Sequence, residues 1–167
     1  MSPMDVDPIT LRPATNEDAA HVRAVVLAVR DEFAVACDPA CGADDDLDDI
    51  EGTYVQRGGA FKVLELADGT IVGAVGLYPV RPGVCELRKM YVLREARGLG
   101  LGKRMMTEML ADARRLGFHR IELETSSALE AAAGLYRSFG FRPVAPEHLW
   151  SQCDAAYALD LDERQRA

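Results

Sequence analysis

A glycine-rich loop lies between a strand-like segment and an amphipathic segment, and it is the part of this sequence best suited to bind a ligand. Gly98, Gly100 and Gly102 occur at every second position. Because glycine has no Cβ, the main-chain N–H groups of residues 98–102 can point in one direction. A helix predicted over residues 103–116 would add its unpaired N-terminal amides. The loop is therefore predicted to bind an anion.

The spacing of the loop excludes two common classes of nucleotide site. A P-loop requires glycine five positions before Gly102 and serine or threonine after Lys103, but Arg97 and Arg104 stand at those places. The dinucleotide fingerprint Gly-x-Gly-x-x-Gly, counted from Gly98, fails because Lys103 occupies the position of its third glycine. A nucleotide triphosphatase and a dinucleotide-binding domain are both disfavoured.

The pattern that remains is Arg97-x-x-Gly100-x-Gly102, which follows the strand-like Met90-Tyr91-Val92. It resembles the pyrophosphate-binding motif, Arg/Gln-x-x-Gly-x-Gly/Ala, of the GNAT superfamily of acyl-CoA-dependent N-acetyltransferases. Residues 132–141, Ala-Ala-Gly-Leu-Tyr-Arg-Ser-Phe-Gly-Phe, resemble the C-terminal motif of the same superfamily. Both motifs occur in the family's order and at its separation, and the resemblance covers about residues 60–145.

The resemblance implies acetyl-CoA as the co-substrate, with no metal. The main chain of Met90, Tyr91 and Val92 would pair with the pantetheine arm like an added strand. The residues that would hold the pyrophosphate are Arg97, Gly98, Leu99, Gly100, Leu101, Gly102 and Lys103. One position departs from the family, because Leu129 stands where many members have an asparagine that contacts the cofactor.

The resemblance also gives chemical roles to Tyr136 and Glu86. The reaction needs a neutral amine to attack the thioester, a group that polarises the carbonyl and a proton for the departing thiolate. Tyr136 is the family's thiolate acid by position, and the alternative is an aromatic side chain that only packs in the core. Glu86 stands where some relatives have the base, and the alternative is a surface carboxylate paired with Arg88. The N–H of Val92 would polarise the carbonyl.

Two further expectations concern side chains near these residues. Strand alternation places Glu86 on one face together with Arg88, Met90 and Val92. Cys153 precedes a late strand, near where acceptors bind in this family. Catalysis through an acyl-cysteine would need a base beside it, so an inert buried thiol is the favoured interpretation.

The predicted elements place these residues in an α/β fold. Strands are expected over residues 9–13, 61–66, 70–78, 84–93, 121–125, 141–144 and 155–161. Helices are expected over about 15–33, 44–56, 103–116 and 128–139. The helix 103–116 is a crossover that makes the strands around it parallel. We therefore expect a GNAT-like, mostly antiparallel sheet of about seven strands, with helices on both faces and a parallel strand pair around the cofactor cleft.

Length and composition predict a single domain, residues 1–167, with 49% hydrophobic residues for one core. The chain has no apolar run of 18 residues and does not start like a signal peptide, so we expect a cytoplasmic protein without a membrane span. The four cysteines form no Cys-x-x-Cys pair, which disfavours zinc. The acidic stretch from Asp44 lacks the glycine and glutamate of an EF-hand, which disfavours calcium.

Charge is distributed unevenly along the chain, whose net charge is −8. Residues 81–104 carry seven Arg or Lys and two Glu, a local charge of +5 that suits the phosphates of the cofactor. Residues 38–51 carry six Asp and one Glu without a basic residue, a local charge of −7. The resemblance places this acidic segment on the helices that flank the acceptor groove, so we expect an acceptor amine that is cationic at neutral pH, on a small molecule or a peptide. The net negative charge disfavours a nucleic-acid partner.

Two classes of function stay open at this stage. The favoured one is an acyltransferase that moves acetyl to a primary amine by direct attack in a ternary complex. The alternative is a non-catalytic acyl-CoA-binding sensor or interaction module on the same fold. The sequence does not identify the acceptor, and it leaves open whether the protein is a homodimer.

Overall fold

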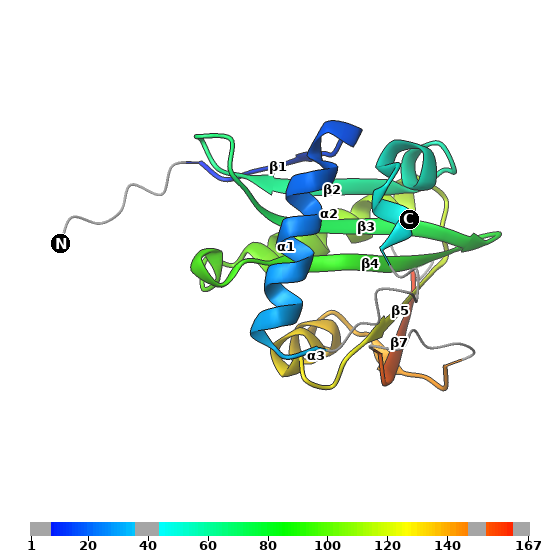
Figure 1. Ribbon diagram of the computed structural model, residues 1–167. Coiled ribbons are helices and arrows are strands. Elements are labelled where there is room, and N and C mark those ends of the chain that lie inside the picture. Colours follow the sequence, from blue (N-terminus) through cyan, green and yellow to red (C-terminus); the bar gives the residue numbers. More distant parts are fainter. Residues whose placement is uncertain (1–7, 36–43, 147–152, 162–167) are drawn as a thin grey trace.

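The computed structural model describes residues 8–35, 44–146 and 153–161, and it contains a seven-stranded sheet with helices on both faces (Figure 1). The strands are β1 (Thr10–Pro13), β2 (Ala60–Glu65), β3 (Ile71–Arg81), β4 (Val84–Val92), β5 (Arg120–Thr125), β6 (Arg142–Pro143) and β7 (Ala155–Asp160). Their order in the sheet is β1-β2-β3-β4-β5-β7-β6. All neighbours are antiparallel except β4 and β5. The predicted sheet and its parallel pair are confirmed.

Three α-helices cover the sheet, α1 (Ala19–Glu32) on one face and α2 (Leu101–Arg115) and α3 (Glu130–Ser138) on the other (Figure 1). Short 3-10 turns η1 (Asn16–Asp18) and η5 (Arg94–Ala96) precede α1 and the glycine loop. The apolar stripe of α1 includes Val22 and Val26, and that of α2 includes Met105 and Met109, all four buried. Among the described residues, no helix is long and apolar enough to cross a membrane.

Three helices begin at different residues from those predicted. α1 starts at Ala19 instead of about residue 15, because the 3-10 turn η1 occupies Asn16–Asp18. α2 starts at Leu101 instead of residue 103, because Gly100, with a φ of +74°, already serves as its N-cap. α3 starts at Glu130 instead of residue 128. The turn before it is fixed by Asp154, whose carboxylate accepts hydrogen bonds from the N–H and the hydroxyl of Ser127 at 2.7 and 2.6 Å.

The segment 44–56 does not form the predicted α-helix. It contains a 3-10 turn, η3 (Asp45–Leu47), and a short π-helix, η4 (Glu51–Val55). Five of the six residues 44–49 are aspartates, whose short side chains bond nearby main-chain groups and compete with a regular helix. The carboxylate of Asp49, for example, accepts the N–H of Gly52 at 2.9 Å.

β4 contains a bulge at Lys89. Ala74 of β3 pairs with Tyr91, and Gly76 pairs with Arg88, so two residues of β4 face a single residue of β3 between these pairs. Lys89 has a φ of +53°, a left-handed conformation that costs roughly 1–2 kcal/mol for a residue with a Cβ.

The bulge overturns the prediction that Glu86, Arg88, Met90 and Val92 share one face. Arg88 does lie beside Glu86, to which its Nε donates a hydrogen bond at 2.8 Å. Met90 and Val92 instead pack against the core on the α2 and α3 side. The reason is that one additional residue in a strand reverses the alternation of all residues after it.

A buried polar network joins the end of α1, the acidic segment and β4. Arg30 donates to the carboxylate of Asp44 at 2.6 and 3.0 Å, and Lys89 Nζ lies 2.8 Å from the same carboxylate. Lys89 Nζ also lies 3.4 Å from Asp46, which accepts a hydrogen bond from the hydroxyl of Tyr54. Burial alone would raise the pKa of Asp44, but the hydrogen bonds from Arg30 and Lys89 outweigh burial and lower this pKa to about 2.

Asp44→Asn should destabilise the protein by about 3 kcal/mol at neutral pH, because it removes a charge from between two buried cations. The pKa of Asp44 is lower in the folded protein than its ordinary value of 3.8, so its contribution is complete above about pH 5. This contribution is lost as the pH falls from about 4 toward 2. Urea unfolding of both proteins between pH 2 and 7 should show a difference that shrinks in acid. A difference that is constant with pH would contradict an ionic origin.

Candidate active site

The site lies where β4 and β5 separate. Their pairing joins Val84–Glu86 to Arg120–Glu122. Farther along, β4 continues to pair with β3, and β5 continues to pair with β7. The strands therefore diverge toward α3 and the end of α1 (Figure 1). Beyond Glu86, the main-chain groups of β4 on this side are not paired with β5.

A groove runs from the divergence along the glycine loop. Its walls come from the end of β4, the loop, α2 and α3, and they comprise Met90, Tyr91, Val92, Arg97, Gly98, Gly100, Leu101, Gly102, Met105, Ala131, Ala132, Leu135 and Tyr136. Eight of the ten residues predicted to bind the cofactor thus border one groove. The other two, Leu99 and Lys103, have exposed side chains outside its walls.

The glycine loop leaves open space beside its main chain. Gly98 and Gly100 have φ angles of +82° and +74°, which explains why glycine occupies these positions. A Cβ added to either residue would meet no other atom within 4 Å. The loop is therefore not filled by packing, and it fits an anionic group held by main-chain N–H groups at the start of α2.

Arg97 connects this loop to α1 and to β4. Its guanidinium donates two hydrogen bonds to the carboxylate of Glu32, at 2.8 and 2.7 Å, and its Nε donates to the carbonyl of Val92 at 3.1 Å. It also lies over the ring of Phe33, 5.1 Å from the centroid. The hydrogen bond from Arg97 lowers the pKa of Glu32, so this carboxylate stays charged at neutral pH.

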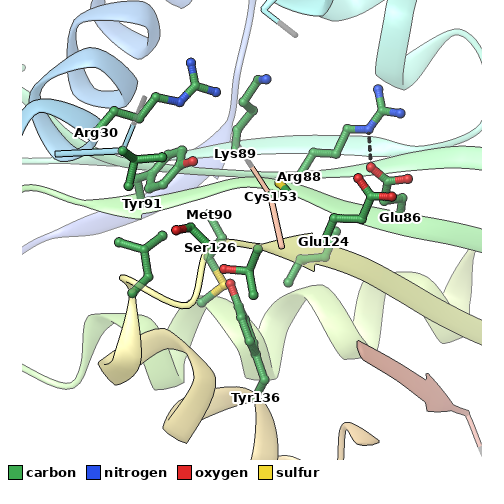
Figure 2. A pocket seen from close by; sticks show the side chains of 14 residues that line it. Arg30, Glu86, Arg88, Lys89, Met90, Tyr91, Glu124, Ser126, Tyr136 and Cys153 are labelled. Carbon is green, nitrogen blue, oxygen red and sulfur yellow. Dashed lines mark hydrogen bonds and ion pairs between the residues drawn. The ribbon is translucent and has the colours of Figure 1, made fainter. Parts of the chain in front are cut away.

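A second cavity adjoins the groove. It is lined by residues from α1 and the turn after it, β4, β5, the turn before α3, α3 itself and the segment before β7. These residues are Arg30, Val35, Glu86, Leu87, Arg88, Lys89, Met90, Tyr91, Glu124, Thr125, Ser126, Leu129, Tyr136 and Cys153. Figure 2 shows the carboxylates of Glu86 and Glu124 together at one side and the ring of Tyr136 rising toward Ser126. Met90, Tyr91 and Tyr136 line both spaces, so the groove and the cavity meet at these three residues.

Tyr136 is buried at this meeting point, with 6% of its surface exposed. Its ring packs against Phe141 and Tyr157, with centroids 5.9 and 6.1 Å away. Burial raises the pKa of the Tyr136 phenol well above that of an exposed tyrosine. The hydroxyl therefore stays protonated at neutral pH and can donate a hydrogen bond into either space.

Two carboxylates border the second cavity, and sequence reasoning identified only one of them. Glu86 is paired with Arg88, as the alternative interpretation expected, but both side chains are less than 20% exposed. The pair therefore forms part of the cavity wall instead of the outer surface. Glu124 was missed, although the alternation of β5, in which Glu122 and Glu124 are partly exposed between buried residues, places it on the same face as Glu122.

Cys153 and Leu129 complete the wall of the cavity without supplying reactive groups. Burial, followed by the nearby charge of Glu124, raises the pKa of the Cys153 thiol to about 12. A thiol that stays protonated is a weak nucleophile, which supports the inert interpretation. His148, which is five residues before Cys153 in the sequence and would be a candidate base for it, lies outside the described residues. Among the residues that the structure describes, no group of three His, Cys, Asp or Glu side chains could hold a metal.

Comparison with known proteins gives consistent matches. The model of the acetyltransferase (GNAT) family matches residues 26–141. An uncharacterised N-acetyltransferase of Escherichia coli (strain K12), YjgM, is 35% identical over 138 residues, which are 80% of this chain and 82% of that protein. The matched part of the chain spans only 64% and 50% of the length of two other curated relatives.

Solved structures share the fold. The crystal structure of a GNAT-family acetyltransferase from Staphylococcus aureus Mu50 superposes with a TM-score of 0.86 at 23% identity, over 93% of this chain and all of that one. The yncA acetyltransferase structure from Salmonella typhimurium, which contains its cofactor acetyl-CoA, gives a TM-score of 0.72 at 22% identity, over 95% of this chain and 96% of that one.

Proposed function

This chain belongs to the acetyltransferase (GNAT) family of acyltransferase enzymes, and we propose that it transfers acetyl from acetyl-CoA directly to a primary amine while both substrates are bound. The observation that carries the proposal is that the groove and the second cavity meet at Met90, Tyr91 and Tyr136. A thioester in the groove and an amine in the cavity would lie face to face at this point, as direct transfer requires.

The groove suits acetyl-CoA in three respects. The open loop at Gly98 and Gly100 offers main-chain N–H groups to the diphosphate. Met105 and Leu135 offer apolar contact, and the β5-facing edge of β4 offers hydrogen-bonding groups to the amides of the pantetheine arm. Arg97 can contribute as well, because a guanidinium has five N–H donors and the bonds to Glu32 and Val92 use three of them.

In the proposed reaction the amine nitrogen attacks the thioester carbonyl carbon. A C–N bond forms, the C–S bond breaks, the nitrogen loses a proton to a base, and the sulfur leaves as a thiolate that acquires a proton. The N–H of Val92 would donate to the carbonyl oxygen as negative charge develops on it. We assign the base to Glu86 or Glu124, the two carboxylates of the second cavity.

We assign to Tyr136 the hydrogen bond to the departing sulfur. Its raised pKa makes the phenol a weaker acid than the thiol that it would generate, whose ordinary pKa is about 8.5. Complete transfer of the phenolic proton to the thiolate is therefore uphill. Donation of a hydrogen bond to the developing negative charge is favourable, and the base that accepted the amine proton can return it to the thiolate.

For the acceptor we propose an amine that arrives as a cation and releases one proton to solvent before the neutral nitrogen attacks. The acidic segment attracts a cation less strongly than its local charge of −7 suggests, because the carboxylates of Asp44 and Asp46 face the cations Arg30 and Lys89. The attraction would come instead from Glu124 in the second cavity, because Glu86 there is paired with Arg88. Release of CoA thiol from acetyl-CoA in the presence of a panel of small amines and peptides, with the products read by mass spectrometry, tests the reaction and identifies the acceptor class.

Acetyl-CoA should raise the melting temperature of the protein, and Gly100→Ala should abolish most of this increase because its methyl group enters the space beside the loop. Gly117→Ala is a matched control. Gly117 also has a positive φ, +90°, with no atom within 4 Å of an added Cβ, but it lies at the far end of α2. Each substitution should cost about 1 kcal/mol of stability, or about 2–4 °C. Equal increases with acetyl-CoA in both variants would show that the loop is not the diphosphate site.

Tyr136→Phe should lower kcat by about 10²-fold and leave the affinity for acetyl-CoA nearly unchanged, because it removes only the hydrogen-bond donor. Tyr157→Phe is the control, since its ring packs beside Tyr136 and its hydroxyl accepts a bond from Arg137 at 3.3 Å. The control should keep the wild-type kcat. A wild-type kcat in Tyr136→Phe would restrict Tyr136 to a packing role.

Glu86→Gln and Glu124→Gln should differ in their effect on kcat. The variant that lacks the base should lower kcat by about 10²-fold, whereas the other should keep kcat close to the wild-type value. The measurement is kcat for one acceptor at each pH between 5 and 9, with variants compared at the same pH because deprotonation of the amine raises the rate with pH in all of them. If neither variant lowers kcat, neither carboxylate is the base.

A further inference from the structure

The left-handed conformation of Lys89 is not explained by its residue type. Among the described residues, only Lys89 and Ala34 combine a side chain with a positive φ. In this conformation the Cβ of an L-residue crowds its own carbonyl, whereas glycine adopts it freely. The surrounding structure must therefore hold the bulge of β4 in place.

Two carboxylates of the acidic segment hold Lys89. Its Nζ lies 2.8 Å from Asp44 Oδ1 and 3.4 Å from Asp46 Oδ1, and its side chain is only 7% exposed. Both carboxylates are themselves fixed, Asp44 by Arg30 and Asp46 by the hydroxyl of Tyr54. Asp46 Oδ1 is buried and has no hydrogen-bond partner, so the nearby ammonium of Lys89 supplies the charge that faces it.

The bulge decides how the end of β4 meets the groove. Because Lys89 turns toward the acidic segment, Met90 turns the other way, toward Tyr136 (Figure 2). Val92 likewise packs on the α2 and α3 side, and both residues line the groove. If the bulge were flattened, the alternation would reverse, and a different set of main-chain groups would face the groove.

We propose that Lys89 is a positioning residue whose ion pairs with Asp44 and Asp46 hold the β4 bulge, and thereby the strand edge along which the pantetheine arm binds. The inference rests on the proposed function, because it concerns the strand that would hold this arm. It gives the described part of the acidic segment a structural role in cofactor binding. It also explains why a lysine stands at a position whose backbone favours glycine, since glycine could not reach the two carboxylates.

The test compares two ligands. Acetyl-CoA contains the pantetheine arm, whereas 3′-phosphoadenosine 5′-diphosphate is the nucleotide part alone. Dissociation constants are measured by calorimetry for both ligands. Lys89→Met, which keeps an unbranched side chain one atom shorter but removes the charge, should weaken binding of acetyl-CoA at least tenfold and binding of the nucleotide less than twofold. Unchanged binding of acetyl-CoA, or an equal loss for both ligands, would overturn the proposal.

Two further variants separate backbone geometry from charge and from stability. Lys89→Gly also lacks the ammonium but accepts a positive φ, so it should bind acetyl-CoA more tightly than Lys89→Met does. Equal losses in the two variants would show that the conformation of the bulge is not what matters. Lys62→Met removes another half-buried ammonium, paired with Asp112 at 2.9 Å, from an ordinary strand position of β2. It should leave both affinities unchanged.

Amide hydrogen exchange in the ligand-free protein tests the bulge without any ligand. Lys89→Met should speed exchange at least tenfold at Tyr91, which pairs with Ala74, and at Leu93, whose N–H donates to the carbonyl of Val72 at 2.8 Å. Effects in β2 should be smaller, and Lys62→Met should leave β4 unchanged. If wild-type protein binds neither ligand, the proposed function is wrong, and exchange alone then decides the role of Lys89. Wild-type exchange across β4 in Lys89→Met would overturn that role.

Discussion

The separation of β4 from β5 is the constraint on which the rest of the structure depends. A parallel pair that remained bonded along its length would satisfy the main chain of both strands and leave no entry between them. Here the pairing ends at Glu86 and Glu122, and Tyr136 of α3 lies where the strands part. The separated edges need other partners for their N–H and C=O groups. An extended ligand with amide groups supplies such partners, and the pantetheine arm has this chemistry.

The parts of the fold with local signals in the sequence were predictable. The glycine loop, the helix after it and the crossover that makes β4 and β5 parallel all follow from residue types at short spacing. The end of α3 at Ser138, followed by Gly140 with its positive φ, is another such signal. Eight groove residues were named from one motif because a motif carries its own local geometry.

The parts that depend on distant residues were not predictable. The bulge at Lys89 leaves no mark on the alternation of β4, because its cause lies in Asp44 and Asp46 on a segment far along the chain. The same ion pairs explain why the acidic segment turns inward where a continuous helix was expected. Glu124 and Arg30 could be recognised as lining the second cavity only once the positions of β5 and α1 were known. Residue propensities and hydrophobic periodicity describe short stretches of sequence, so they do not predict ion pairs between distant residues.

Charge along the chain is also a poor guide to charge at the site. Much of the local +5 of residues 81–104 is partnered within the protein, with Lys89 held by Asp44, Arg88 by Glu86 and Arg97 by Glu32. The predicted Lys103 lies outside the groove walls. Apart from the N–H groups of Arg97 that its bonds to Glu32 and Val92 do not use, the donors that line the groove at the glycine loop are main-chain N–H groups. Their positions are set by Gly98, Gly100 and the start of α2. Anion binding in this groove therefore depends more on the conformation of the loop than on the number of basic side chains near it.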